Sequence, residues 1–306
     1  MRLAYLAVAA AFALPAVAQS AAQAQELTGT LKKIKETGSI TLGVRDSSVP
    51  FSYLDDKQQP VGYAIDICRK VVESVKKELA LPALKVNMNP VTSATRIPLM
   101  ANGTIDLECG STTNNADRQK QVAFTNTYFL TASKFVSKTA SKLGSIDDLK
   151  GKTVVSTSGT TNIRQLNDAN VARKLGINIL TAKDHAEAFL LVETDRAVAF
   201  VMDDVLLASL VASSKEPGAY IISTDAFSMP EPYSIMLRRD DAPFKKLVDG
   251  ATATLYGSPE GVALYEKWFT KPIPPRNLNL NLPMAPVLSR AFKAPSDNAD
   301  PAHYGS

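Results

Sequence analysis

The residues with the clearest chemistry lie in two short segments of the first half of the chain. Arg96 follows Ser93 at what reads as the start of a short helix, and a hydroxyl-rich loop that includes Ser111 and Thr113 follows the next expected strand. An arginine presents a planar fork of N–H donors, and Ser and Thr hydroxyls beside free backbone N–H groups add more. Together they suit a small carboxylate ligand. An exposed ion pair beside a polar turn would use the same residue types.

A second donor-rich turn, Ser158 to Thr161, favours the carboxylate interpretation. It leads from an expected strand into an expected helix, where unpaired N–H groups and the helix dipole attract an anion. Arg45 ends the first expected strand, and ligands of open α/β sheets usually bind just past the carboxyl ends of strands. Asp203 follows another strand and is a candidate partner for a cation, although a helix N-cap is an alternative role for Asp203 or Asp204.

The elements that must position these residues alternate between strand and helix. Ser93 is expected to cap a short helix that ends at Ala101. Apolar spacing predicts further helices at 31–36, 63–79, 161–175 and 184–194, and strands at 40–45, 84–89, 105–109, 153–155, 177–180 and 198–202. This alternation predicts α/β layers with mostly parallel sheets. Because roughly 280 residues exceed what one core usually serves, two domains or lobes are expected.

The N-terminus predicts export. Arg2 precedes an apolar run at residues 3–17, and Ala-Gln-Ala at 22–24 fits a signal-peptidase site, with Ala-Val-Ala at 16–18 as the second choice. We therefore expect a signal peptide at 1–24 and a mature chain in the periplasm. No stretch approaches the roughly 20 apolar residues of a spanning helix, so direct membrane insertion is not expected. The Pro-, Asn- and Ser-rich end from residue 295 is expected to be a loose tail.

Composition excludes several other classes of function. The chain is 45% hydrophobic and 21% charged, with a formal net charge of +4 and acidic and basic residues interleaved. Because there is no basic block with interleaved aromatics, nucleic acid is not an expected partner. The chain has two histidines and no CxxC, so no metal and no cofactor are expected. Cys68 and Cys109 are both expected in the core, and in an oxidising compartment either a disulfide between them or two buried thiols is possible.

Several motifs in order resemble one family of binding proteins. They include Arg-Asp-Ser-Ser-Val-Pro-Phe-Ser-Tyr at 45–53, Ser-Ala-Thr-Arg-Ile-Pro-Leu at 93–99, Glu-Cys-Gly-Ser-Thr-Thr-Asn-Asn at 108–115, Thr-Ser-Gly-Thr-Thr at 157–161, Ala-Lys-Asp-His at 182–185, Met-Asp-Asp at 202–204 and Lys-Pro-Ile-Pro-Pro at 271–275. The chain resembles the periplasmic amino-acid-binding proteins of ABC importers (bacterial solute-binding protein family 3), and within them the acidic amino-acid receptors. The resemblance covers nearly the whole mature chain.

That resemblance implies a type II periplasmic-binding-protein fold, in which two α/β lobes joined by two crossing strands hold the ligand in a cleft. The crossings would fall near residues 128–134 and 231–237. Lobe 1 would comprise residues 25–130 plus 234–288, lobe 2 residues 131–233, and the C-terminal tail residues 289–306. The implied protein is a monomer that binds L-glutamate or L-aspartate and delivers it to the membrane permease subunits of an ABC importer.

The resemblance also implies roles for single residues. Arg96 would hold the ligand α-carboxylate and Asp203 the α-ammonium. Backbone and hydroxyl donors at Ser111, Thr113 and Thr161 would assist Arg96, while Arg45, Ser93 and His185 would surround the side-chain carboxylate. A polar helix cap without ligand contact is the alternative role for His185. Two arginines and one aspartate balance a ligand with two carboxylates and one ammonium, and buried charges require such partners.

One feature departs from the family pattern, and three rival functions remain. Close relatives can pair the cysteine at position 109 with one in the second crossing strand, but residues 233–237 contain none.

The rival functions are a periplasmic dehydratase-like enzyme on the same scaffold, a receptor for glutamine or asparagine, and the sensor of a membrane receptor or channel. The enzyme would need an acid/base pair, for which His185 with Glu108 or Asp203 are the visible candidates. The sensor would need a membrane segment in the same chain.

Overall fold

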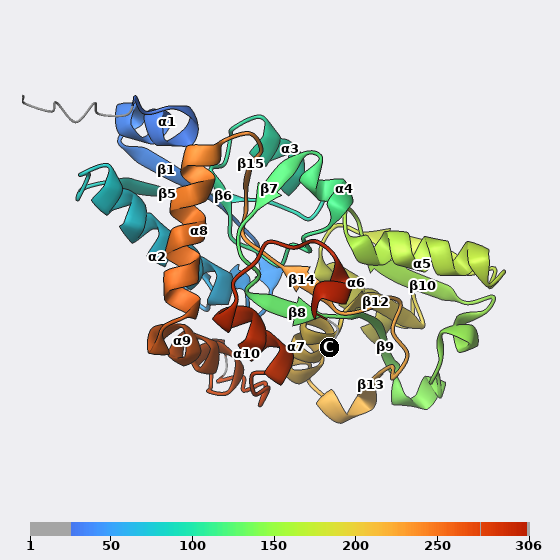
Figure 1. The fold of residues 1–306 in the computed structure, drawn as a ribbon. Coiled ribbons are helices and arrows are strands. Elements are labelled where there is room, and N and C mark those ends of the chain that lie inside the picture. The colour runs from blue at the N-terminus through green and yellow to red at the C-terminus, as the bar shows by residue number, and fades with distance from the viewer. Residues whose placement is uncertain (1–25, 276, 305–306) are drawn as a thin grey trace, which may run out of the picture.

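The computed structural model describes residues 26–275 and 277–304, so the expected signal peptide at 1–24 lies outside the described residues. Two five-stranded sheets form the centres of two α/β lobes. Figure 1 shows β8 and β14 in the middle of the molecule, between the half that carries α1, α2 and α8 and the half that carries α5 and β10. The predicted two-lobed architecture is confirmed.

The sheet of the first lobe has a parallel centre and one antiparallel strand added late in the chain. Strand β1 is parallel to both neighbours, whereas β15 is antiparallel to both of its own. Its strand order is β5 (Lys85–Pro90), β1 (Ser39–Val44), β6 (Leu107–Glu108), β15 (Met236–Arg238), β7 (Val122–Phe124). The alternation of strands and helices in the sequence predicts parallel strands. It therefore predicts only part of each sheet, because each sheet also contains antiparallel strands.

The second sheet repeats this plan. Strand β10 is parallel to its two neighbours, and β9 is antiparallel to both of its own. Its strand order is β11 (Asn178–Ala182), β10 (Thr153–Thr157), β12 (Ala199–Asp203), β9 (Ser133–Lys138), β13 (Tyr220–Ile222). The carboxyl ends of β10 and β12 therefore lie side by side, and they carry Thr157 and Asp203 to one edge of this sheet.

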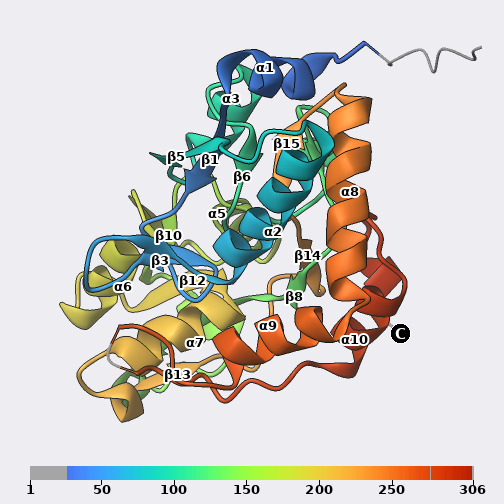
Figure 2. The ribbon, with the colours of Figure 1, turned by 90° about the vertical axis from the view of Figure 1, so that its left-hand side faces the viewer.

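Helices and short strands complete the two lobes. Figure 2 shows α2 and α8 running beside each other over the first lobe. The helices are α1 (Gly29–Thr37), α2 (Tyr63–Glu78), α3 (Arg96–Ala101), α4 (Ala116–Gln119), α5 (Thr161–Ala172), α6 (His185–Glu193), α7 (Asp204–Ser213), α8 (Ala242–Tyr256), α9 (Pro259–Phe269), α10 (Pro286–Lys293), and the 3-10 turns η1 (Thr139–Ser141), η2 (Ile146–Leu149), η3 (Pro217–Ala219), η4 (Pro301–Tyr304). A small sheet of β2 (Ser47–Ser48), β3 (Ser52–Leu54) and β4 (Pro60–Val61) follows β1.

The crossing strands lie inside the predicted segments. Strand β8 (Phe129–Thr131) pairs antiparallel with β14 (Glu231–Tyr233). The ring of Phe51 contacts both strands, with centroids 5.0 Å from Phe129 and 5.3 Å from Tyr233, in edge-on geometry. Aromatic packing of this kind anchors the crossing to the core of the first lobe. The residue boundaries proposed above for the two lobes stay a prediction.

The sequence periodicity predicted the long helices well. Helix α2 begins and ends within one residue of the predicted 63–79, because Ile67, Val71 and Val75 place one apolar face on the core. Helix α1 ends at Gly38, which adopts a left-handed φ of 62° and donates its N–H to the carbonyl of Ile34.

The prediction of a loose C-terminal tail is wrong for the described residues. Helix α10 stacks Phe292 on Tyr256 with ring centroids 4.7 Å apart, and Thr127 N–H donates to the carbonyl of Ser296 at 2.8 Å. The hydroxyl of Tyr304 lies 2.8 Å from that of Thr127, just before the crossing strand β8. The contacts of Ser296 and Tyr304 contradict the prediction, whereas helix α10 ends at Lys293, before residue 295. Leu288 and Phe292 share the buried face of this helix.

Candidate functional site

Arg96 begins helix α3, as predicted, but Ser93 is not the cap of that helix. The N-cap position is Thr95, which makes no side-chain cap bond. The Ser93 hydroxyl instead accepts a 2.9 Å hydrogen bond from Nη2 of Arg45. This correction has a physical reason: the buried guanidinium of Arg45 needs an acceptor, and Ser93 lies beyond the neighbouring strand β5.

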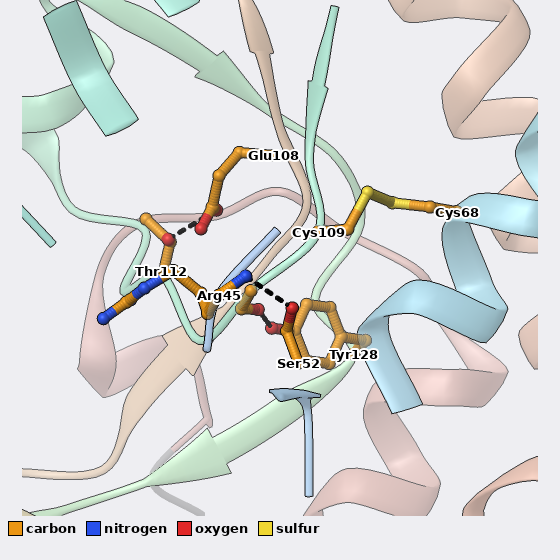
Figure 3. Close-up of a disulfide and its surroundings, with 8 residues drawn as sticks. Arg45, Ser52, Cys68, Glu108, Cys109, Thr112 and Tyr128 are labelled. Atoms are coloured by element: carbon orange, nitrogen blue, oxygen red, sulfur yellow. Dashed lines mark hydrogen bonds between the residues drawn. A yellow bond between two sulfur atoms is a disulfide. The ribbon is translucent and has the colours of Figure 1, made fainter. Parts of the chain in front are cut away.

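The carboxylate of Glu108 and the hydroxyl of Thr112 orient the guanidinium of Arg96. Arg96 Nη1 donates to the carbonyl of Ser111 at 3.0 Å and to the hydroxyl of Thr112. That hydroxyl donates at 2.6 Å to Glu108 (Figure 3). The other carboxylate oxygen of Glu108 lies 3.9 Å from Arg96 Nη1. All four residues are buried. Arg96 is therefore oriented before any ligand arrives, which lowers the ordering cost of binding.

Arg45 is fixed at the end of β1. Its backbone N–H donates to the hydroxyl of Ser52 at 2.8 Å (Figure 3), and its side chain is buried. Burial first, and then the charge of Arg96, lower the pKa of Arg45 to about 10. A Cβ on Gly110 would lie 2.9 Å from Cγ of Arg45 and 2.3 Å from a carboxylate oxygen of Glu108, so this position requires glycine. Because the charge of Arg96 lowers the pKa of Arg45, the two arginines form one concentrated positive region.

In the second lobe, His185 opens helix α6 directly after its N-cap Asp184, whose carboxylate accepts from the N–H of Glu187 at 3.0 Å. His185 itself is therefore not the cap. Its Nδ1 lies 3.0 Å from the Thr157 hydroxyl, and its pKa is well below the usual 6.5, chiefly through burial and then through Arg45 and Arg96. The imidazole is therefore neutral at pH 7.

Asp203 does not use its side chain as a helix cap. It occupies the N-cap position of α7 without a cap hydrogen bond, and its carboxylate accepts from Asn162 at 2.8 Å and from the hydroxyl of Tyr233. The neighbouring Asp204 instead accepts from Thr131 of the crossing strand at 2.7 Å. Burial raises the pKa of Asp203, so a bound cation nearby would stabilise its charged form.

Two threonines meet where the lobes face each other. Thr113, just after the first-lobe strand β6, and Thr161, the first residue of α5, have hydroxyl oxygens 3.5 Å apart. The N-cap of α5 is Thr160, which accepts from the N–H of Ile163 at 3.2 Å. This leaves the side chain of Thr161 free of the capping role and directed at the first lobe.

The structure brings the predicted residues together around one cavity. This cavity is small. Its lining includes Ser93, Arg96, Ser111, Thr113, Thr161, His185 and Asp203, and Arg45 joins them through its bond to Ser93. Within residues 26–275 and 277–304, four buried atoms around it have no hydrogen-bond partner: Arg45 Nη1, Arg96 Nε, Ser111 Oγ and His185 Nε2. Buried polar groups are normally satisfied, so these atoms define where a polar ligand fits.

Some supporting residues escaped the sequence analysis. Asn162 and Tyr233 orient Asp203. Arg118 resembles an ordinary surface arginine in sequence, but it is buried and donates to the carbonyl of Thr113, which lines the cavity. Glu108 was considered only as an acid/base candidate. For these supporting residues the sequence offers one signal. Asn162 lies two residues past the Ser158–Thr160 turn, on the first turn of α5.

The arrangement offers little for acid/base chemistry. His185 bonds Thr157, Glu108 bonds Thr112 behind Arg96, and the partners of Asp203 are an amide and a phenol. Within the part of the chain that the structure describes, no His–carboxylate pair forms and no cluster of three or more metal-ligating side chains occurs. Donors and matched charges are what binding requires, and the enzyme alternative would need a general base within reach of a substrate.

A disulfide tethers the loop that follows β6. Cys68 and Cys109 are bonded, with Cα atoms 6.2 Å apart, which decides between the two possibilities left open by the sequence (Figure 3). Cys68 lies on the buried face of α2, and Cys109 directly follows Glu108. The bond therefore fixes the start of the loop that carries Ser111 and Thr113 to a long core helix.

We expect the double variant Cys68→Ala/Cys109→Ala to lose stability and some affinity. The bond closes a loop with a sequence separation of 41, for which chain entropy gives about 4 kcal/mol, and measured losses are about 2–4 kcal/mol. Urea unfolding measures the first effect. Calorimetry should show that a carboxylate ligand binds several-fold more weakly, because the loop that carries Ser111 and Thr113 is less ordered. A variant with lower stability and unchanged affinity would contradict the role of the tether in positioning the loop.

The comparison with family models identifies the class of protein. Residues 40–271 match the bacterial extracellular solute-binding proteins, family 3. The chain belongs to this family. In the described residues, no helix is long and apolar enough to cross a membrane.

Individual relatives extend this result. The chain is 52% identical over 293 residues to the L-glutamate/L-aspartate-binding protein of Pseudomonas aeruginosa, covering 95% of each chain. It is 46% identical over 283 residues to the glutamate/aspartate import solute-binding protein of Escherichia coli, covering 92% of this chain and 93% of the relative.

Solved structures agree on the fold. An ancestral arginine-binding protein bound to arginine superposes with a TM-score of 0.68 at 26% identity, covering 76% of this chain and 98% of the other. An ancestral amino-acid-binding protein that is a precursor of cyclohexadienyl dehydratase superposes with a TM-score of 0.67 at 28% identity, covering 79% of this chain and 100% of the other. The type II two-lobed fold predicted from the sequence is confirmed.

Proposed function

We propose that this chain is a receptor that binds L-glutamate and L-aspartate and delivers them to an ABC-type import permease. The observation that carries the proposal is a small cavity lined by the buried guanidinium of Arg96 and the buried carboxylate of Asp203, with a second buried guanidinium, Arg45, bonded to Ser93 of its lining. The names of the 52% and 46% identical relatives support the same ligands. In this site Arg96 takes the α-carboxylate, with donors at Ser111, Thr113 and Thr161, and Asp203 takes the α-ammonium.

The distal subsite distinguishes acidic from neutral amino acids. Arg45, Ser93 and His185 surround the side-chain carboxylate, and Nη1 of Arg45 and Nε2 of His185 supply two donors that have no partner among the described residues. Glutamine would place an uncharged amide against a buried guanidinium. An unpaired buried charge costs several kcal/mol, on the order of 3–5 kcal/mol when one partner of a buried pair is lost. The site therefore rejects glutamine and asparagine.

The net charge of the closed site supports a ligand of charge −1. Arg45, Arg96 and Arg118 bring three positive charges, and Glu108 and Asp203 bring two negative charges, all buried. Glu231, also buried, has a pKa raised to about 7 by desolvation and by Asp203, so it adds only part of a charge near neutral pH. An acidic amino acid, with two carboxylates and one ammonium, completes the balance.

The cellular setting of the receptor follows from the same proposal. Export through a signal peptide cleaved after Ala24, or after Ala18, would place the mature chain in the periplasm as a monomer. There it would present its closed, loaded form to the membrane permease subunits of the importer. Among the rivals, the dehydratase-like enzyme finds no paired general base in the described site.

A calorimetric screen tests the proposal. The mature chain, residues 25–306, is titrated with each of the twenty common amino acids, and the glutamate solution is afterwards analysed for products. We expect stoichiometric 1:1 binding of glutamate and aspartate with both recovered unchanged. Binding of a neutral or basic amino acid in preference to both would contradict the proposed ligands, and turnover of the ligand would support the enzyme instead.

Binding is expected to couple to protonation of His185. In the free protein its pKa is well below 6.5, and a distal carboxylate raises that pKa because a nearby anion favours the imidazolium. The contribution to affinity is therefore fully present below the free-state pKa and is lost as pH rises through the bound-state pKa. Calorimetry in buffers of different ionisation enthalpy, between pH 6 and 8, measures the proton uptake directly.

The variant His185→Gln is the matched control for this coupling. Asp203 and Glu231 also titrate abnormally, so only the difference in proton uptake between wild type and variant belongs to His185. We expect that difference to be largest near pH 6 and small at pH 8, with glutamate affinity reduced in the variant. Equal proton uptake by the two proteins would leave only a neutral imidazole donor. Equal affinity would remove His185 from the site.

A further inference from the structure

The C-terminal segment that follows helix α10, residues 294–304, has no part in the site described above. It lies outside residues 40–271, which match the family, so the common fold of the family does not assign it a role. In Figure 1 it runs, in red, from the end of α10 across the crossing strands β8 and β14. It ends in the turn η4, where the side chain of Tyr304 is buried. We call this segment the strap.

The strap holds the far end of the loop after β6, residues 110–114, which we call the ligand loop. Asn114 ends this loop and is fully buried, and its Nδ2 donates to the carbonyl of Asp297 in the strap at 2.8 Å. Its Oδ1 accepts from Nε2 of Gln119 at 2.9 Å. The same Nε2 also donates to the carbonyl of Asp297, at 3.1 Å. Because the disulfide already fixes the start of the ligand loop, the loop is fastened at both ends.

The ligand loop lies on the crossing strands, and the strap holds these strands as well. The backbone N–H of Asn114 donates to the carbonyl of Pro232 in β14 at 2.8 Å. Just before β8, the backbone N–H of Thr127 donates to the carbonyl of Ser296 at 2.8 Å, and its hydroxyl lies 2.8 Å from that of Tyr304. The strap therefore joins the ligand loop and the start of the crossing in one hydrogen-bonded network.

An ion pair anchors the strap to helix α8. Nζ of Lys245 lies 2.9 Å from a carboxylate oxygen of Asp297. The same Nζ donates to Asp249 at 2.6 Å and to the carbonyl of Phe124, at the end of β7, at 2.9 Å. The carboxylate of Asp297 is thus held by α8, while its backbone carbonyl accepts from the end of the ligand loop. This arrangement ties the position of the loop to the core of the first lobe.

We propose that the strap positions the ligand loop, so that the donors of this loop are ordered before a ligand arrives. Without the strap, the side-chain amide of Asn114 and the N–H of Thr127 lose their acceptors, and water in their place would not hold the backbone. A loop that becomes ordered only on binding lowers the affinity. Under the proposed function, on which this step rests, the loop binds the α-carboxylate, so every amino acid should be affected equally.

The test compares the mature chain, residues 25–306, with a shortened chain that ends at Lys293 and lacks the strap. Hydrogen exchange of the ligand-free proteins should be faster in the ligand loop of the shortened chain and unchanged in strand β10 of the second lobe. Calorimetry should give Kd values for glutamate and aspartate that rise by one common factor of roughly 5 to 20, as one or two lost hydrogen bonds require. The ratio of the glutamate and glutamine affinities should stay unchanged.

Two point variants of the whole mature chain keep the test decisive if thermal melting shows that the shortened chain does not fold. Asn114→Ala removes the side-chain bond to the strap and should change loop exchange and both Kd values in the same direction. Tyr304→Phe removes only the hydroxyl that faces Thr127 and should have a smaller effect. The matched control is Tyr220→Phe in strand β13 of the second lobe, which should change Kd by less than about twofold.

The outcomes distinguish this inference from the proposed function. Mature protein that binds neither glutamate nor aspartate contradicts the proposed function, whereas faster exchange of the ligand loop without the strap would still support the positioning role. Unchanged loop exchange in the shortened chain, or in Asn114→Ala if that chain does not fold, contradicts the inference alone. Faster exchange with unchanged affinity also contradicts it, because the strap would then order the loop without serving the site.

Discussion

The variant Arg96→Met is expected to lose binding of every amino acid, by about three orders of magnitude for glutamate. In the proposed site Arg96 faces the α-carboxylate, which all amino acids share, and removal of one partner from a buried charge pair costs about 3–5 kcal/mol. At about 1.4 kcal/mol per factor of ten, 4 kcal/mol corresponds to almost a thousandfold. Calorimetric titration with glutamate, aspartate and glutamine measures this loss.

A second substitution separates binding from folding in this experiment. Without Arg96, the buried carboxylate of Glu108 keeps only the hydroxyl of Thr112, and an unpaired buried charge destabilises the fold. The double variant Arg96→Met/Glu108→Gln removes both charges and should recover most of the lost stability. It should not recover binding. Micromolar glutamate binding by either variant would contradict the assignment of Arg96 to the α-carboxylate.

The second large effect is expected for Arg45→Met, and it should depend on the ligand. Arg45 bonds Ser93 and, in the proposed site, faces only the distal carboxylate, so glutamate and aspartate should each lose about 3 kcal/mol or more. Glutamine should lose little binding free energy, because its neutral amide does not supply the counter-charge that the guanidinium of Arg45 needs. Discrimination between glutamate and glutamine should therefore fall by roughly a hundredfold.

The matched control for Arg45→Met is Arg164→Met, which removes one exposed positive charge of the second lobe and leaves the cavity intact. It separates a general electrostatic effect on anionic ligands from the local effect in the distal subsite. Raised salt should weaken binding of acidic ligands only slightly in both proteins, because buried pairs are poorly screened. An equal loss of glutamate and glutamine in Arg45→Met would move Arg45 out of the distal subsite.

The parts of this site that the sequence could predict are those governed by local rules. Helices begin at Thr161 and His185 within one residue of the predicted starts, because a Thr or Asp N-cap precedes an apolar pattern in each case. Asp203 at the carboxyl end of β12 and Arg45 just past that of β1 follow from the rule that ligands bind at the carboxyl edge of a sheet.

The parts that escaped depend on contacts between distant segments. Nothing near Arg118 in sequence indicates that it is buried or that it donates to Gly159 in the other lobe. The partner of Cys109 stayed open, since no sequence pattern gives a Cα separation. Ser93 suited a helix cap by residue type, but the demand of Arg45 for an acceptor decided its role.

The central claim is that the cavity selects ligands by the charge of a distal carboxylate. A comparison of the affinities for glutamate and glutamine tests this claim most directly. The two ligands have almost the same shape and differ by one charge. Competition calorimetry on residues 25–306 at pH 7 should give glutamate a Kd at least roughly 100-fold below that of glutamine, as about 3 kcal/mol of unpaired charge requires. Glutamine that binds as tightly as glutamate, or tighter, would contradict the account.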